Sequence, residues 1–225
     1  MKLSNISFNY GTKKIYENFT VEFPENRITC ILGPSGCGKT TLLNIISGSL
    51  DYSGEINKES DNIGYIFQTP VLLNHLTIWE NINIVLKKKV KNTAKRNLII
   101  NQILKKVDLL NDKDSYPFSL SGGMAQRVSI ARAFAYNPDI LLMDEPFKGL
   151  DLSLKKHIIT IFKELYSEKK ITVIMVTHDI DEALLLSDNI IILNQNKIIY
   201  QKEIIKTNRT ISDFPDIRSE IYQLL

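Results

Sequence analysis

The chain has 225 residues, of which 44% are hydrophobic and 24% are charged. A chain of this length buries enough apolar surface to fold without disulfides or structural metals. Its formal net charge of +3 is too small to indicate a nucleic-acid or anionic-lipid ligand. Two cysteines, Cys30 and Cys37, exclude a disulfide framework and favour a reducing, cytosolic compartment.

No apolar run reaches the ~18 residues that a membrane-spanning helix needs. The N-terminal residues also lack the apolar block of a signal peptide. We therefore expect any membrane role to depend on a partner.

The first third of the chain combines strand patterns with one helix. Alternation of apolar and polar residues predicts half-buried strands at 3–8 and 19–23. The apolar run 27–32 predicts a buried strand, and helical periodicity follows it at 39–47. Residues 63–67 predict a further strand.

The middle of the chain is mostly helical in pattern from 79 to about 110. We interpret the lysines within Lys87–Lys91 as a solvated face or loop of this helical part. Pro117 ends the pattern, and Ser121 occupies the N-cap position of a helix that runs to about residue 135.

The last third returns to strands. The fully apolar runs 140–143 and 172–177 predict buried parallel strands, with a helix at 152–166 between them. Residues 189–193 and 197–200 predict a hairpin. Together, the elements predict an α/β fold with a mainly parallel sheet, interrupted by a helical insertion at about 69–137.

A phosphate-binding motif lies between the strand at 27–32 and the helix at 39–47. It reads Gly33-Pro34-Ser35-Gly36-Cys37-Gly38-Lys39-Thr40 and is followed by Thr41. Glycines let backbone N–H groups turn inward around a phosphate, and the helix N-terminus adds partial positive charge. Lys39 supplies a point charge to the β- and γ-phosphates, and the hydroxyl of Thr40 is a ligand for Mg²⁺. This motif predicts nucleotide binding.

Cys37 allows two interpretations. A thiol near a lysine and a helix N-terminus can be reactive. We favour the simpler interpretation that Cys37 is a small residue that fits the loop, since no second cysteine and no histidine lies near it in the sequence.

Two adjacent carboxylates end the apolar strand at 140–143. Ligands of parallel sheets bind at the carboxyl ends of strands. Asp144 is therefore the expected Mg²⁺ residue, and Glu145 the expected general base for the attacking water. A pair of solvated surface acids is the alternative, and a small-molecule kinase with a phosphate loop fits these motifs equally well.

A second anion site distinguishes these possibilities. The segment Leu120-Ser121-Gly122-Gly123-Met124-Ala125-Gln126-Arg127 places a capping hydroxyl and two bare backbone N–H groups at a helix start. One nucleotide does not need two such sites in one chain. Two copies placed head to tail would bring the second site of each over the γ-phosphate of the other.

With these motifs in this order, nearly the whole chain resembles the ATP-binding subunits of ABC transporters. The resemblance implies a P-loop NTPase (RecA-like) core with a mainly parallel sheet, an antiparallel β subdomain and an α-helical subdomain inserted at about 69–137. A short C-terminal helical tail at about 210–225 would complete a single ATPase domain, residues 1–225.

The resemblance also implies roles for individual residues. Tyr10 matches the aromatic residue that stacks on adenine, and Gln68 the glutamine that contacts Mg²⁺ and water. Asp151 matches the end of a loop that crosses the dimer interface and contributes to the nucleotide site. His178 matches the histidine that contacts the γ-phosphate and steadies the water beside Glu145. His75 and His157 match nothing catalytic.

The same resemblance implies an assembly. Two ATPase subunits, expected to be identical, would close around two Mg-ATP molecules. Integral membrane permease subunits would dock near Leu72–Asn81, and an extracytoplasmic solute-binding protein would deliver the solute. The chain would then lie at the cytoplasmic face of the cell membrane, and no nucleic-acid partner is expected.

Details point to one branch of the family. Met124 after Ser-Gly-Gly, and Phe147 after Asp-Glu-Pro, are similar to importers of the nitrate, sulfonate and taurine type, or of thiamine precursors. Ala125 and Lys148 depart from the usual pattern without removing a catalytic group. An export or lipoprotein-release motor stays an alternative, and a non-transport ABC ATPase or a small-molecule kinase is less favoured.

Overall fold

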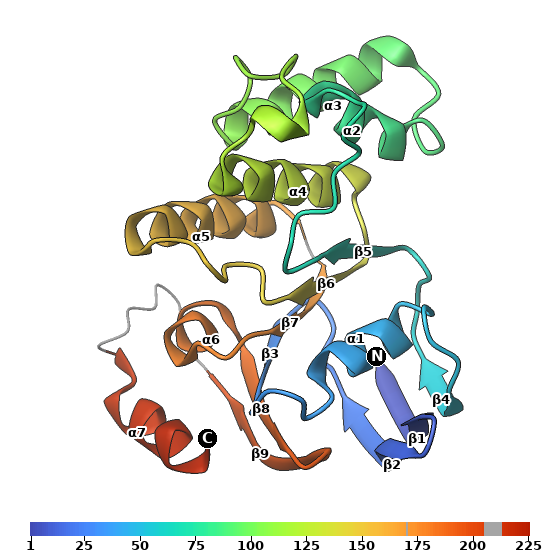
Figure 1. Ribbon diagram of the computed structural model, residues 1–225, viewed down its shortest axis with the longest axis vertical. Helices are drawn as coiled ribbons and strands as arrows, with labels where there is room; N and C mark the ends of the chain where they lie inside the picture. The colour runs from blue at the N-terminus through green and yellow to red at the C-terminus, as the bar shows by residue number, and fades with distance from the viewer. Residues whose placement is uncertain (170, 205–212) are drawn as a thin grey trace. The chain divides into compact units, whose positions relative to one another are not determined.

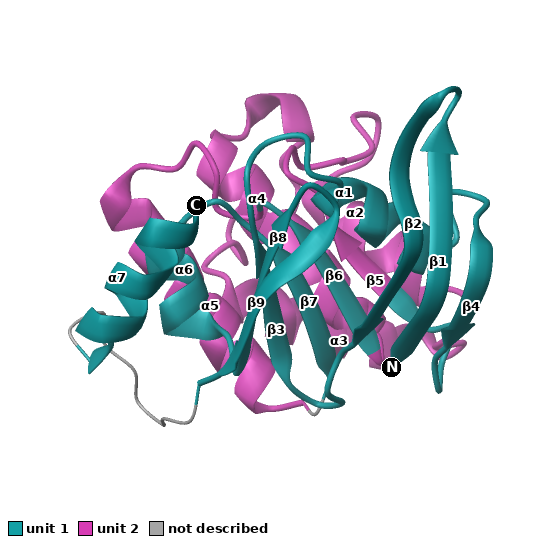
Figure 2. Ribbon diagram, turned by 90° about the horizontal axis from the view of Figure 1, so that it is seen from below, with its two compact units in different colours: residues 1–63, 140–145, 171–225 teal, residues 64–139, 146–170 magenta. Residues whose placement is uncertain are grey.

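The computed structural model describes residues 1–169, 171–204 and 213–225, and Figure 1 follows their course along the chain. The chain divides into two compact units. The first contains residues 1–63, 140–145 and 171–225, and the second contains residues 64–139 and 146–170 (Figure 2). The second unit thus includes residues 146–170 in addition to the helical stretch expected at 69–137. The assignment of a single ATPase domain stays a prediction.

A mainly parallel sheet forms the centre of the first unit. Within this unit its strands lie in the order β6-β7-β3-β8-β9. The first four are parallel and the last pair is antiparallel. Their bounds are β3 (Ile28–Leu32), β6 (Ile140–Asp144), β7 (Thr172–Val176), β8 (Asn189–Asn194) and β9 (Lys197–Glu203). Every residue of β3, β6 and β7 is buried, which explains why their sequences are almost entirely apolar. The predicted α/β fold is confirmed.

A separate antiparallel sheet carries β2 (Lys13–Glu22), β1 (Lys2–Tyr10) and β4 (Ser53–Asn57), in that order. β2 begins well before the predicted residue 19, because Ile15 and Tyr16 are both buried at irregular register and break the alternation. β4 was not predicted, since four of its five residues are exposed and leave no apolar pattern.

Among its described residues, the first unit contains three helices: α1 (Lys39–Ile46), α6 (Ile180–Leu186) and α7 (Pro215–Leu224). α6 has seven residues, too few for a clear helical period, and the sequence did not reveal it. α7 lies within the tail predicted at about 210–225, of which residues 210–212 fall outside the described part of the chain.

The second unit is mostly helical. It contains α2 (Ile78–Leu86), α3 (Thr93–Lys106), the 3₁₀ turn η1 (Pro117–Ser119), α4 (Gly122–Tyr136) and α5 (Leu152–Ser167), while β5 (Ile63–Ile66) starts at the boundary between the units. The single helical stretch predicted at 79–110 is two helices. Thr77 and Glu80 form a capping box at the start of α2, and Asn92 caps α3. Among the described residues, none of the helices has the length and apolar character required to span a bilayer.

An aromatic cluster holds the core of the second unit together. The ring of Phe162 on α5 lies 5.8 Å from Phe134 on α4, 6.4 Å from Phe147 and 6.1 Å from Tyr166, measured between centroids. Phe162 is fully buried. Rings at these separations add to the burial of apolar area.

We expect Phe162→Ala to lower the free energy of unfolding by about 3–5 kcal/mol, because it opens a cavity among these rings. Chemical denaturation followed by circular dichroism measures the loss. Phe118 is 80% exposed and provides the matched control. Its replacement by alanine should change the same free energy by less than about 0.5 kcal/mol, and an equal loss in both variants would contradict the assignment of the core.

Candidate nucleotide-binding site

The loop between β3 and α1 folds around the side chain of Lys39, the first residue of α1. Lys39 is 7% exposed, and its ammonium group donates hydrogen bonds to the carbonyl oxygens of Gly33 at 2.7 Å and Pro34 at 2.9 Å. The positive charge is thus held inside the loop by the loop's own backbone. This arrangement presents a fixed cation beside the N-terminus of α1, where an anion is also favoured by the helix.

A side chain at position 38 would collide with Tyr16, which explains the glycine there. Its φ is 97°, and a Cβ at this position would lie 2.9 Å from the hydroxyl of Tyr16. Tyr16 instead donates a hydrogen bond to the carbonyl of Gly38 at 3.0 Å. Burial raises the pKa of Tyr16, so the phenol stays protonated and remains a donor. The sequence analysis missed Tyr16, because a buried tyrosine in a strand carries no sign of its partner.

A cavity of about 370 Å³ opens beside this loop, a size that suits a small-molecule ligand. Tyr10 at its rim is 50% exposed, which leaves the ring available for stacking. The cavity is lined by Tyr10, Lys13, Ile15, Ser35, Gly36, Gly38, Lys39, Thr40, Thr41 and Glu145. Tyr10 and six of the residues predicted between Gly33 and Thr41 therefore line one cavity, and Lys13 joins them without having been predicted.

Cys37 lies within the same loop and is buried. Its Sγ atom is 3.9 Å from the ammonium nitrogen of Lys39. A buried thiol is poorly accessible to reagents, which favours the interpretation that Cys37 fills space in the loop.

Thr40 and Asp144 meet at the edge of the parallel sheet. The hydroxyl of Thr40 donates to a carboxylate oxygen of Asp144 at 3.1 Å. In the part of the chain that the structure describes, no three His, Cys, Asp or Glu side chains cluster as metal ligands. One hydroxyl and one carboxylate fit Mg²⁺, which binds few protein groups and completes its shell with water and phosphate oxygens.

Glu145 adopts a strained backbone conformation. Its φ is 44°, a left-handed value that is uncommon for residues other than glycine. Its N–H donates to the carbonyl of Val176 at 2.8 Å, which ties this conformation to the end of β7. Strain of this kind costs about 1–3 kcal/mol and concentrates at functional sites.

His178 lies beside Glu145. Its Nδ1 is 3.5 Å from the Oε1 atom of Glu145. The side chain of His178 is 58% exposed, whereas that of Glu145 is 15% exposed. The pair combines a sheltered carboxylate with an imidazole that is open to an incoming ligand, as a water-activating site requires.

The second unit carries the other predicted site residues, Ser121–Gly123, Asp151 and Gln68. Ser121 caps α4, and its hydroxyl accepts a hydrogen bond from the N–H of Met124 at 3.3 Å. A Cβ on Gly122 would meet open space, whereas one on Gly123 would overlap the side chain of Leu154 on α5. Gly122 therefore leaves room beside the helix start, whereas a side chain at position 123 would require Leu154 to move.

Asp151 caps α5, the helix that carries Leu154. Its Oδ1 accepts hydrogen bonds from the N–H groups of Ser153 at 3.1 Å and Leu154 at 3.0 Å, which cap α5. The bond from the Leu154 N–H, followed by that from the Ser153 side chain, holds the pKa of Asp151 below its usual value. Asp151 orients the turn whose Leu154 packs on Gly123. Gln68 is exposed at the end of β5.

Gln126 is a further residue that the sequence analysis did not assign. It is 3% exposed, and its amide donates to the carbonyl of Pro146 at 2.5 Å. Pro146 directly follows Glu145 in the chain. Gln126 therefore anchors the segment that leaves the predicted base.

We expect Gly123→Ala to destabilise the protein by about 1–3 kcal/mol, because the added methyl group overlaps Leu154. Gly122→Ala is the matched control and should leave the free energy of unfolding unchanged to within about 0.5 kcal/mol. Denaturant titrations of the two variants measure both effects. The double variant Gly123→Ala, Leu154→Ala should behave like Leu154→Ala alone, and additive losses would contradict the overlap.

Comparison with known proteins adds to this geometry. The family model described as "ABC transporter" matches residues 16–148. The sulfate/thiosulfate import ATP-binding protein CysA of Vibrio vulnificus is 37% identical over 229 residues, which cover 93% of this chain and 66% of the relative. The aliphatic sulfonates import ATP-binding protein SsuB of Bacillus thuringiensis is 37% identical over 226 residues, covering 95% of this chain and 89% of the relative. The chain thus spans slightly less than two thirds of that CysA protein.

Two solved structures share the fold. The dimeric post-hydrolysis state of the ATP-binding cassette MJ0796, bound to ADP and Pi, has a TM-score of 0.80 at 31% identity and covers 92% of this chain and 99% of its own. The structure of cbiO1 from Clostridium perfringens has a TM-score of 0.82 at 24% identity, covering 99% of this chain and 90% of its own, and shows the fold alone. The resemblance stated from the motifs is confirmed: the chain belongs to the ABC transporter family of ATP-binding proteins.

Proposed function

We propose that this chain is an ATP-hydrolysing subunit that dimerises around two Mg-ATP molecules and drives separate membrane subunits. One observation carries the proposal. The first unit holds a phosphate loop, a cavity and the Glu145–His178 pair, while the second unit holds a capped helix start with open space at Gly122. Both sites can contact the same nucleotide only when two copies pair head to tail, so that each copy contributes its helix start to the cavity of the other. The dimeric form of the MJ0796 cassette supports this arrangement.

Nucleotide binding follows from the residues around the cavity. The exposed ring of Tyr10 would stack on adenine, and Lys39 would pair with the β- and γ-phosphates. Thr40 and Asp144 would hold Mg²⁺, with Gln68 as a further contact. When bound, Mg²⁺ neutralises charge on the β- and γ-phosphate oxygens.

Hydrolysis needs a base for the attacking water and donors for the developing charge. Glu145 would accept the proton, since its carboxylate is sheltered and fixed at the end of β6. His178 would hydrogen-bond the γ-phosphate and steady the water. The Ser121 hydroxyl and the N–H groups that follow it would come from the partner copy and donate to the same phosphate. Closure of the dimer would exclude water from these groups.

Glu145→Gln should leave ATP binding intact and lower turnover about 100-fold or more, because the amide cannot accept the proton. The variant should also form a longer-lived dimer with Mg-ATP, since the closed state is left by hydrolysis. Steady-state phosphate release and size-exclusion chromatography with ATP measure the two effects.

The matched control for this substitution is Glu55→Gln, which removes an exposed carboxylate on β4. It should leave turnover unchanged. Full turnover in the Glu145 variant would rule out Glu145 as the base.

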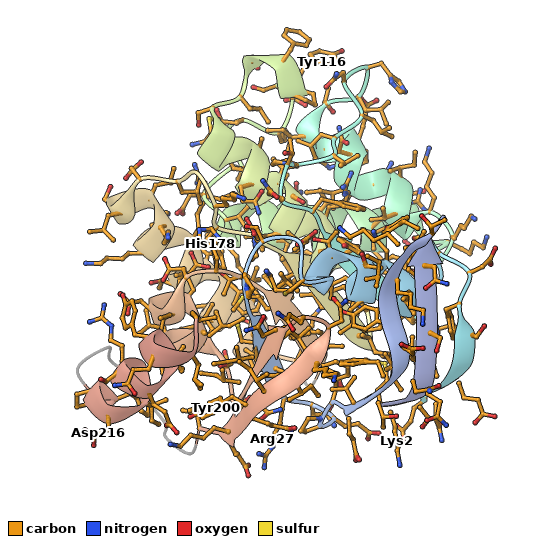
Figure 3. The ribbon with its side chains drawn as sticks, turned by 60° about the horizontal axis from the view of Figure 1, so that its bottom comes forward. Lys2, Arg27, Tyr116, His178, Tyr200 and Asp216 are labelled. Carbon is orange, nitrogen blue, oxygen red and sulfur yellow. The ribbon has the colours of Figure 1, made fainter. Side chains whose placement is uncertain are left out.

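Exposed apolar side chains of the second unit support a docking surface for the membrane subunits. Val71, Leu73, Tyr116 and Phe118 expose 54%, 37%, 41% and 80% of their area. Their two segments are joined side by side, because the N–H of Ile78 donates to the carbonyl of Ser115 at 2.9 Å. The rings of Tyr116 and Phe118 stack at 5.6 Å, and Figure 3 shows Tyr116 at the outer edge of the molecule. Exposed apolar side chains gathered in this way are typical of protein interfaces.

The segment expected to dock, Leu72–Asn81, is preformed. Asn81 is fully buried, and its amide nitrogen donates to the carbonyls of Leu73 at 3.1 Å, Leu76 at 3.1 Å and Thr77 at 3.0 Å. Its Oδ1 accepts from the N–H of Leu73 at 2.8 Å. A rigid apolar surface binds with a smaller loss of entropy. We propose that it receives a cytoplasmic helix of the permease.

The double variant Tyr116→Ser, Phe118→Ser should weaken co-purification with the membrane subunits while leaving ATP hydrolysis by the isolated chain within about twofold, because the surface is used for assembly. Pull-down from detergent-solubilised membranes measures the first effect and phosphate release the second. Leu98 on α3 is 58% exposed, so Leu98→Ser is the matched control and should retain the membrane subunits. Equal retention by both variants would place the docking site elsewhere.

The transported solute is proposed from the relatives. The CysA and SsuB relatives are named for the import of sulfate and thiosulfate and of aliphatic sulfonates, respectively. They support import of a small solute of the nitrate, sulfonate or taurine type, delivered by a solute-binding protein to the outer side of the permease. The chain would then lie at the cytoplasmic face of the membrane. Identification of the co-purifying permease, followed by uptake of labelled solutes, tests the direction and the solute.

A further inference from the structure

The loop that carries His178 is braced from both sides. Before it, the hydroxyl of Thr177 donates to Oε2 of Glu182 at 2.6 Å, and Glu182 is 4% exposed. After it, the N–H of Asp179 donates to the same Thr177 hydroxyl at 3.1 Å. The backbone on each side of His178 is therefore tied to one buried hydrogen-bonded group.

These bonds lead to the first turn of α6. The Oδ1 atom of Asp179 accepts hydrogen bonds from the N–H groups of Asp181 at 2.9 Å and Glu182 at 3.2 Å. Asp179 thereby caps α6. The position of His178 depends on where this turn lies, because Glu182, Asp179 and Thr177 connect the two.

The C-terminal helix holds the same turn from outside. Nη2 of Arg218 on α7 donates to Oδ2 of Asp181 at 3.0 Å, and its Nε lies 3.0 Å from Oδ1. The contact is therefore one charge-assisted hydrogen bond, with a second close approach between the same two charged groups. Figure 2 shows α7 alongside α6, and the two helices are in contact.

α7 is in turn anchored on the sheet. The Tyr200 hydroxyl on β9 donates to Oε2 of Glu220 at 2.8 Å, and the Lys202 ammonium lies 2.9 Å from the same oxygen. Figure 3 labels Tyr200 on this strand and His178 on its loop. A continuous series of hydrogen bonds and ion pairs therefore runs from β9 through α7 and α6 to the histidine loop.

We propose that Arg218 is a positioning residue for His178, and that α7 orients the histidine by holding the first turn of α6. This inference rests on the proposed function, in which His178 contacts the γ-phosphate. α6 has seven residues, too few to be stable by itself, so its position depends on neighbours. His178 is largely exposed, so its imidazole is directed by the backbone that carries it.

The effect should fall on turnover and leave ATP binding unchanged. Tyr10, Lys39 and Thr40 line the cavity, and Arg218 does not line it. A displacement of about 1 Å in a group that assists the reaction lowers the rate up to about 100-fold. If Arg218 merely stabilised the fold, its substitution would lower thermal stability without lowering kcat selectively at an unchanged KM.

The experiment uses the purified full-length chain with four variants. Arg218→Ala removes the contact, and Arg218→Lys keeps one charged donor. The exchange Arg218→Asp with Asp181→Arg rebuilds the pair in reverse. Ser219→Ala is the matched control, since it changes an exposed side chain of α7 and leaves the contacts of Arg218 and Glu220 in place.

We expect Arg218→Ala to lower kcat about tenfold at an unchanged KM for ATP, which is a moderate displacement on the scale given above. Arg218→Lys should recover part of the loss, the exchange variant most of it, and Ser219→Ala should stay within twofold of the parent. An equal loss in the Ser219 and Arg218 variants, or a rise in KM with kcat unchanged, would overturn the proposal.

A second measurement does not depend on catalysis. The chain has three histidines, so their ring signals can be assigned by substitution in nitrogen-15 spectra recorded without nucleotide. Arg218→Ala should shift or broaden the His178 signal and leave those of His75 and His157 in place. An unchanged His178 signal overturns the inference. A parent protein that does not hydrolyse ATP would refute the proposed function, and the spectra would then decide this inference alone.

Discussion

The parallel register of the central sheet is the constraint on which the site depends. Val176 at the end of β7 pairs with Ile31 on β3 and with Asp144 on β6. Because these strands end at one edge, the loops that follow them start side by side. That alignment brings the phosphate loop, Glu145 and His178 close to one another. A hydrogen bond to Val176 holds the strained φ of Glu145. The strand pairing that places Val176 therefore also helps to offset the strain of the Glu145 backbone.

The distribution of groups over two units explains why one chain would be incomplete. The proposed base, the histidine and the phosphate loop belong to the first unit, and Ser121 with its open neighbour Gly122 belongs to the second. Within the second unit, Asp151 caps α5, and Leu154 of that helix packs on Gly123. A rigid connection between these loops would let the second unit act as one body when two copies close around nucleotide. The mechanism we propose uses this rigidity.

The C-terminal helix gives this chain a feature beyond the shared motifs. Arg218 reaches the first turn of α6, and that turn is bonded to both sides of the His178 position. The motifs bring the proposed catalytic groups to one edge of the sheet, and we infer that the Arg218–Asp181 contact positions one of them, His178. Contacts of this kind vary easily, because a surface ion pair can be gained or lost without disturbing the core.

The sequence by itself determined the chemistry that depends on local order. The phosphate loop, the acidic strand end at Asp144 and the Ser121 cap were recognised because their residues are neighbours in the chain, and the buried strands because their apolar runs are continuous. Only the tertiary structure decided which distant groups meet. Tyr16 beneath Gly38, Leu154 against Gly123 and Arg218 on Asp181 carry no local pattern, since each contact is made by chain folding. Short elements such as β4 and α6 were not predicted for a related reason. They are too short to show the periodic spacing of apolar residues, and contacts with neighbouring elements stabilise them.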